Sequence, residues 1–175
     1  MNKLKAKIVI LVIAFLSISS PAHADVYIQN DYGNVTWRTC KLYYIYDGYA
    51  KEEIIPTIRY IETISNFTFR KWKKSMKDQP HIEIYYLGES ETGVLGRAVV
   101  MDDYNKARIN NAYVSMFTKN QAVLLHEMLH AIGLAHSEDA NSVMNANYNQ
   151  SQVLTEQDLA NIKNIPCGSK KKKKK

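Results

Sequence analysis

The chain has 175 residues, of which 23 are lysine or arginine and 17 are aspartate or glutamate, and its formal net charge is +6. The positive excess lies at the two ends, in Lys3, Lys5 and Lys7 and in Lys170–Lys175. Without these nine lysines, 14 basic side chains stand against 17 acidic ones, so we expect no nucleic-acid-binding surface. The length suits one domain with a single buried core.

Residues 1–24 have the pattern of a secretory signal peptide. The early lysines precede an apolar run of 11 residues, Ile8–Ile18, and Ala22-His23-Ala24 gives a small-x-small cleavage pattern. The run is short for a bilayer, which takes about 20 residues. We therefore expect cleavage near Ala24 and secretion to the periplasm or the extracellular space. A retained membrane anchor is the alternative.

Strand and helix patterns alternate after residue 36. Lys41–Tyr46 is aromatic and β-branched, which predicts a strand. Lys51–Phe67 carries isoleucines at helical spacing, which predicts a long helix with one face on the core. Arg70–Lys77 is polar and basic, which indicates a loop. Three further segments have strand patterns: His81–Leu87, Val94–Met101 and Ala107–Ser115.

Two more helices are expected in the C-terminal half. Thr118–Gln121 resembles a capping box that opens the first of them. Thr155 is the predicted N-cap of the second, which places Leu159 and Ile162 on its inner side. The order strand, helix, several strands, helix, loop, helix is that of an α/β or α+β domain with three layers.

The segment from His126 to His136 reads H-E-x-x-H-x-x-G-x-x-H, the extended zinc-protease signature. Positions i and i+4 share one helix face, so His126 and His130 can bind the same metal ion. Gly133 can adopt a positive φ and turn the chain, which brings His136 back to the metal. Three neutral nitrogens with a fourth position open to water are typical of a catalytic zinc site.

Glu127 lies beside the first of these ligands, where its carboxylate can serve a zinc-activated water as general base. The alternative is that His126 and His130 are ordinary helix-surface histidines. Three of the five histidines would then share one 11-residue stretch by coincidence. The other two, His23 and His81, have no such neighbours and are taken as ordinary.

Cys40 and Cys167 are the two cysteines of the chain. In an exported protein an even count favours one disulfide, and two free thiols are the alternative.

With these residues in place, the sequence resembles the metzincin clan and, within it, the matrixins, the family of the matrix metalloproteinase catalytic domain. Ser137, directly after the third histidine, is the matrixin-like residue at that position. Ser142-Val143-Met144 looks like the Met-turn, in which Met144 would lie beneath the zinc ligands. Asp158 stands where the family has a residue that buttresses this turn.

The resemblance also implies substrate-contact residues. Tyr148 matches a tyrosine in the wall of the S1′ pocket, and Trp37 lies in a stretch similar to the family's first strand. Gly93–Ala98 is similar to the edge strand along which matrixins pair an extended substrate, which implies contacts from Val94, Leu95, Gly96 and Arg97.

For the fold, the resemblance implies a metzincin or zincin-like catalytic domain over residues 37–168. Its expected parts are a twisted mixed β-sheet, a long first helix, a zinc-binding active-site helix, the Met-turn and a short C-terminal helix.

Three departures from the family pattern narrow this expectation. Arg97 replaces a histidine that binds a second, structural zinc, so we expect one catalytic zinc and neither a structural zinc nor calcium. Ala146 replaces the usual proline of the pocket wall. Gln157 replaces an aspartate that pairs with the freed N-terminus in some members. No cysteine-switch propeptide or propeller is found, so we expect a minimal microbial form.

The two ends of the mature chain carry separate hypotheses. Residues 25–36 form a short N-terminal segment, in which the carboxylate of Asp31 could block the metal as a minimal prosegment; a loose end is the alternative. Residues 169–175 are expected to be disordered. Their lysines, Lys170–Lys175, suit either weak contact with an anionic surface or a solubilising end.

The expected function is that of a secreted, monomeric zinc endopeptidase that acts on protein or peptide substrates. One alternative is a secreted zinc-binding adhesion or inhibitory module, but such a module has no need of Glu127. The other alternative is a zinc amidase that acts on non-protein amides.

Overall fold

The structure, a computed structural model, describes residues 28–168 except 31–32, 77 and 104–107. Within these residues six strands form one mixed β-sheet in the order β3-β8-β6-β4-β5, with β7 on the other side of β8. The bounds of these strands are Thr36–Trp37 for β3, Lys41–Asp47 for β4, Thr68–Lys71 for β5, His81–Tyr86 for β6, Gly96–Asp103 for β7 and Arg108–Met116 for β8.

The sheet is parallel except at one edge. The strands β5, β4, β6 and β8 run in the same direction, and β3 joins β8 in parallel as well. Strand β7 pairs with β8 in antiparallel register, and no strand of the described residues pairs with its other side. The expected mixed sheet with an edge strand is therefore confirmed. A separate antiparallel hairpin joins β1, Gln29–Asn30, to β2, Gly33–Asn34.

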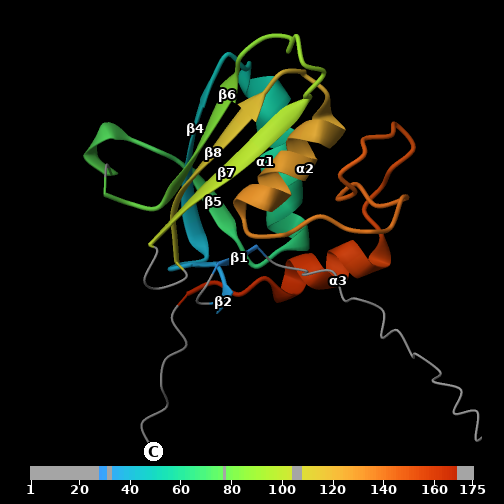
Figure 1. Cartoon of the computed structure of the whole chain (residues 1–175). Coiled ribbons are helices and arrows are strands. Elements are labelled where there is room, and N and C mark those ends of the chain that lie inside the picture. The colour runs from blue at the N-terminus through green and yellow to red at the C-terminus, as the bar shows by residue number, and fades with distance from the viewer. Residues whose placement is uncertain (1–27, 31–32, 77, 104–107, 169–175) are drawn as a thin grey trace, which may run out of the picture.

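In the described part of the chain three α-helices complete the α/β fold: α1 over Lys51–Ile64, α2 over Gln121–Ala131 and α3 over Glu156–Asn164. Figure 1 shows α1 and α2 side by side on one face of the sheet, with α3 at its lower end near the β1–β2 hairpin. The isoleucine stripe of α1 is buried as predicted, with Ile54 and Ile61 at 0% exposure. Its packing against the sheet supplies the main core.

Trp37 connects the start of the sheet to the end of α2. Its side chain is fully buried, and its indole Nε1 donates a hydrogen bond of 3.0 Å to the carbonyl oxygen of Ala131. A helix end leaves its last carbonyls without partners in the helix, so this bond satisfies one of them inside the core. It also fixes where the chain leaves α2.

Some predicted boundaries are wrong. The expected loop Arg70–Lys77 is partly the strand β5, because Phe69 is buried and the segment pairs with β4. The remainder includes the short 3-10 turn η1, Lys74–Met76. Helix α1 ends at Ile64 and not at Phe67, since the N–H and the hydroxyl of Ser65 both donate to the carbonyl of Ile61.

The edge strand is also shifted. Strand β7 begins at Gly96, two residues after the expected start at Val94, because Leu95 closes the turn by accepting a bond from Phe117 N–H. Strand β8 extends one residue past its expected end, to Met116.

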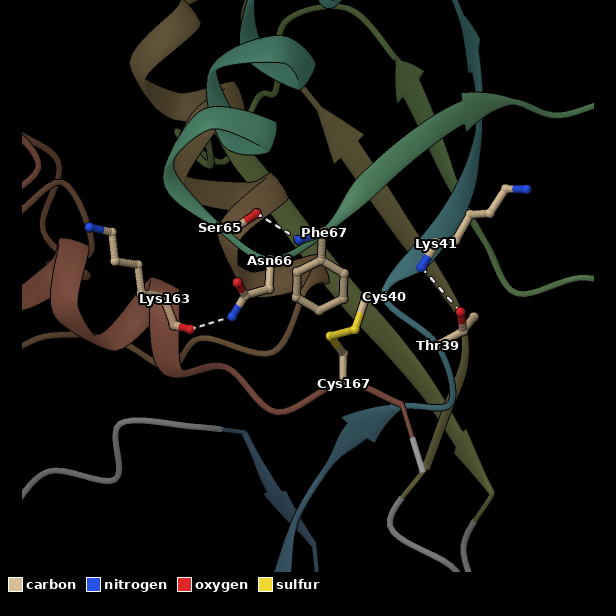
Figure 2. The surroundings of a disulfide bond; sticks show 8 residues. All are labelled: Thr39, Cys40, Lys41, Ser65, Asn66, Phe67, Lys163 and Cys167. Atoms are coloured by element: carbon tan, nitrogen blue, oxygen red, sulfur yellow. Dashed lines mark hydrogen bonds between the residues drawn. A yellow bond between two sulfur atoms is a disulfide. The ribbon is translucent and has the colours of Figure 1, made fainter. Parts of the chain in front are cut away.

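The disulfide between Cys40 and Cys167 is present, with a Cα–Cα distance of 5.1 Å, which confirms that prediction. Figure 2 shows the bond beside the ring of Phe67, with Asn66 reaching across to the end of α3. The Asn66 side-chain amide donates to the carbonyl of Lys163 at 2.6 Å. The C-terminal segment thus lies against the start of the sheet.

Several predictions concern residues that lie outside the described part. These are the signal peptide at 1–24, Asp31 of the proposed prosegment, Ala107, and the lysine tail within 169–175. Within the described part, none of the helices has the length and apolar character needed to cross a membrane.

Candidate metal centre

Helix α2 carries the first part of the site. Its N-cap is Asn120, whose side-chain oxygen accepts hydrogen bonds from the N–H groups of Ala122 and Val123. The predicted capping box at Thr118 is therefore wrong, since asparagine is an equally favourable cap and stands two residues closer to the helix. The helix ends at Ala131, and Gly133 has a φ of +114°, which confirms the predicted turn after the signature.

The three predicted ligand histidines come together at the end of this helix. Their candidate donor atoms all lie within 4.8 Å of one another. The ring of His130 lies 4.5 Å, centroid to centroid, from each of His126 and His136. The helix spacing brings the first two onto one face, and the Gly133 turn returns the third.

Backbone carbonyls hold two of the rings in a defined orientation. The Nδ1 atom of His126 lies 2.6 Å from the carbonyl oxygen of Val143, and that of His130 lies 2.6 Å from the carbonyl oxygen of Leu134. A carbonyl oxygen can only accept, so both Nδ1 atoms donate. In a neutral ring the other nitrogen, Nε2, then carries a lone pair that is free to bind a metal.

The two Nε2 atoms of His126 and His130 lie only 2.9 Å apart. Burial, with a smaller contribution from His126, lowers the pKa of His130 to about 3. Burial also lowers the pKa of His126 and of His136. Protonation is therefore disfavoured, and two facing lone pairs at this distance favour a cation that binds both nitrogens. Three imidazole nitrogens fit zinc, which prefers such ligands.

Glu127 lies against this cluster and is 7% exposed. Burial raises the pKa of its carboxyl group to about 7, although a hydrogen bond from the backbone N–H of Ala98 acts in the opposite direction. Gly96 makes room for it: a Cβ atom on Gly96 would lie 2.7 Å from Glu127 Cγ. The sequence indicated Gly96 as part of the substrate strand. It did not indicate that this residue must also lack a side chain so that Glu127 has room.

The Ser142–Met144 segment connects the histidines to α3. The hydroxyl of Ser142 donates to Asp158 at 2.7 Å and accepts from Met144 N–H at 2.9 Å. The N–H of Ser137, next to His136, donates to the carbonyl of Met144. The predicted contact of Asp158 with this turn is confirmed, and Met144 is buried at 1% exposure.

A pocket of about 350 Å³ opens on one side of the centre. It is bordered by the predicted substrate-contact residues Val94, Leu95, Gly96 and Tyr148. The hydroxyl of Tyr148 accepts a 2.6 Å hydrogen bond from the side-chain amide of Asn120. Asn120 thus caps α2 and holds the pocket wall, a role that the sequence did not suggest.

A groove of about 380 Å³ opens on the other side. Ile28, Arg97, Ala98 and His136 are among its lining residues. The backbone N–H of Ile28 donates to the carbonyl of Gly133, which holds the N-terminal segment next to the ligand turn. Sequence reasoning missed Ile28, because no local pattern indicates a contact between residues more than 100 positions apart.

A mixed sheet with this helix, its turn and its three histidines defines the metal centre of a metzincin. The family model described as matrixin matches residues 30–166, and the chain therefore belongs to the matrixin family.

One solved structure similar to the chain is that of High choriolytic enzyme 1, a hatching enzyme zinc-protease from the medaka fish Oryzias latipes, at 14% sequence identity and a TM-score of 0.38. The match covers 63% of this chain and 50% of that one, so the chain spans about half of that protein's length. A comparison with curated proteins gives no match.

Proposed function

We propose that this chain is a secreted zinc-dependent endopeptidase that hydrolyses peptide bonds of extended protein substrates. The observation that carries the proposal is the pair of tethered imidazoles whose Nε2 atoms face each other at 2.9 Å, with His136 and the buried Glu127 beside them. Membership of the matrixin family, whose members are zinc peptidases, supports the same conclusion.

In this proposal His126, His130 and His136 hold one zinc ion. Zinc supplies Lewis acidity, which polarises a carbonyl group and lowers the pKa of water. The carbonyls of Val143 and Leu134 orient two of the rings and increase their basicity as ligands. Met144 is proposed to support the ligands from below, and its burial supports that role.

Glu127 is the proposed general base. Its carboxylate borders both the pocket and the groove, so it can reach a water molecule at the centre of the cleft. It would accept a proton from the attacking water and later transfer it to the leaving amine. The hydrogen bond from Ala98 N–H keeps the carboxylate next to the edge of the sheet.

The free side of β7 is the proposed substrate platform. A peptide in extended form can add to such an edge through backbone hydrogen bonds, and pockets then select among its side chains. The pocket at Tyr148 would take the side chain next to the scissile bond, with Val94, Leu95 and Gly96 along its rim. Arg97 would contact the peptide on the groove side.

Secretion is part of the proposal and is supported by the signal-peptide pattern of residues 1–24. We propose that the mature protein is a monomer whose partners are its protein or peptide substrates, without nucleic acid. A weak anionic-surface contact through Lys170–Lys175 remains a hypothesis.

Incubation of the purified chain with a denatured protein tests this function. We expect internal peptide-bond cleavage that a chelator abolishes and added zinc restores. An adhesion module would bind without cleaving, and an amidase for non-protein amides would leave the protein intact. Intact substrate after incubation with the zinc-loaded chain would contradict the proposal.

A further inference from the structure

The groove on the His136 side of the centre contains a positive charge that has no partner among the residues the structure describes. Arg97 is exposed and lines this groove. Within the part of the chain that the structure describes, its guanidinium group makes no ion pair or hydrogen bond. Among the described residues, the one acidic side chain that lines the groove is Glu127, which is buried against the histidines.

From this arrangement we propose that Arg97 selects an acidic side chain of the substrate, on the side of the scissile bond opposite to the residue in the Tyr148 pocket. The inference rests on the endopeptidase function proposed above and names its substrate class. A guanidinium group presents two parallel N–H donors that match a carboxylate, so acidic side chains are its natural partners.

The position of Arg97 on the edge strand makes this contact geometrically reasonable. Arg97 and Ala98 are paired in register with Ser115 and Val114 of β8, and the N–H of Ala98 donates to Glu127. Neighbouring side chains of a strand point to opposite faces. A peptide paired with the free side of β7 would therefore place every second side chain on the face of Arg97, with opposing Cβ atoms about 4.5–5.5 Å apart.

The described residues near Arg97 in this groove are apolar or belong to the metal centre. Ile28, Ala98 and Ala135 line it together with the three proposed zinc ligands, His126, His130 and His136. Among the described lining residues no lysine or second arginine competes with Arg97 for an acidic group, and Glu127 is the one carboxylate. The expected preference is modest, because Arg97 is exposed and water screens the pair.

A pair of quenched peptides provides the test. Both peptides have an apolar residue for the Tyr148 pocket on one side of the scissile bond. On the other side, one peptide carries Glu and its counterpart carries Lys at the same position, and successive positions are tested in this way. For the wild type we expect kcat/KM for the best Glu peptide to exceed that for its Lys counterpart by about three- to tenfold, the size expected of cross-strand charge pairs. The ratio should fall as the salt concentration rises.

Two variants and one control assign the effect to Arg97. Arg97→Gln should bring the ratio close to one, and Arg97→Glu should favour the Lys peptide. Arg70→Glu is the matched control, because Arg70 is also an exposed arginine on the sheet but lies on β5, at the opposite edge. This control should keep the wild-type ratio.

The outcomes separate the two proposals. If both peptides are cleaved and Arg97→Glu leaves the ratio of their kcat/KM values unchanged, the Arg97 inference alone is overturned. This would also be the result if the metal ion, and not Arg97, attracted the acidic side chain. A lack of cleavage by the zinc-loaded wild type overturns the endopeptidase function and this inference with it.

Discussion

Asp158 accepts a 2.7 Å hydrogen bond from the hydroxyl group of Ser142, and both side chains are buried. The same carboxylate oxygen accepts from the N–H of Thr155, the N-cap of α3. Ser142 directly precedes Val143, whose carbonyl orients the ring of His126. A carboxylate on α3 therefore helps to set the position of a histidine on α2.

Replacement of Asp158 by alanine would leave the Ser142 hydroxyl and the Thr155 N–H without their acceptor. We expect a loss of about 1–3 kcal/mol in the free energy of unfolding. Because the Val143 carbonyl would be less well fixed, zinc affinity should fall by about 10–100-fold. Urea unfolding and zinc competition with a chromophoric chelator measure the two effects. Glu156→Ala, an exposed change in the first turn of α3, is the control; if both variants bind zinc like the wild type, Asp158 has no such role.

A second prediction concerns Gly96. In the Gly96→Ala variant, the new Cβ would lie 2.7 Å from Glu127 Cγ and 2.9 Å from Glu127 Oε1, so the carboxylate must move. We expect turnover to fall by about 10²–10⁴-fold, the range typical for loss of a general base, with zinc still bound.

The double variant Gly96→Ala/Glu127→Ala distinguishes this cause from loss of substrate pairing. If Gly96→Ala acts through Glu127, the double variant should be no less active than Glu127→Ala alone, since coupled residues are not additive. Full additivity of the two losses would show that Gly96 serves the substrate and not Glu127.

The disulfide should contribute strongly to stability. It joins residues 127 positions apart, and the loss of a native disulfide typically costs about 2–5 kcal/mol. We expect the Cys40→Ser/Cys167→Ser variant to unfold at a lower urea concentration than the wild type. A reducing agent should shift the wild type towards the variant and leave the variant unchanged. Equal midpoints for the oxidised wild type and the variant would contradict a stabilising role.

The N-terminal segment provides a test of latency. Ile28 lines the groove beside the histidines, and residues 25–27 directly precede it. If residues 25–36 act as a minimal prosegment, a chain that starts at Val35 should show a higher initial rate than one that starts at Asp25. The full segment with Asp31→Asn should also be faster if that carboxylate is the blocking group. Thermal unfolding first has to show that each of the three chains is folded. Equal initial rates for all three would then contradict a block of the metal by the N-terminal segment.

Much of the site could be predicted because its candidate metal ligands are local in sequence. His126, His130 and His136 lie within one helix and one turn, and the spacing alone places their nitrogens together. The isoleucine stripe of α1 was equally predictable, because the helical periodicity repeats over 14 residues. The disulfide followed from the expected export of the chain and from its cysteine count.

Features that depend on long-range contacts were not predictable in the same way. Strand β5 has four residues with one buried side chain, Phe69, so its pattern is too short to distinguish from a loop. Its pairing with β4 decides its structure. Likewise, Asn120 is recognisable as a helix cap, but its bond to Tyr148 depends on how a distant loop folds back.

Bound zinc and peptide turnover, measured on the same samples of the wild type, Glu127→Ala and His136→Ala, separate the roles of the metal and of the proposed general base. We expect one zinc per chain for the wild type and for Glu127→Ala, with turnover lower by about 10²–10⁴-fold in the latter. His136→Ala should lose both zinc and turnover. A Glu127→Ala variant within about tenfold of the wild-type rate, or a His136→Ala variant that still holds one tightly bound zinc, would contradict the account.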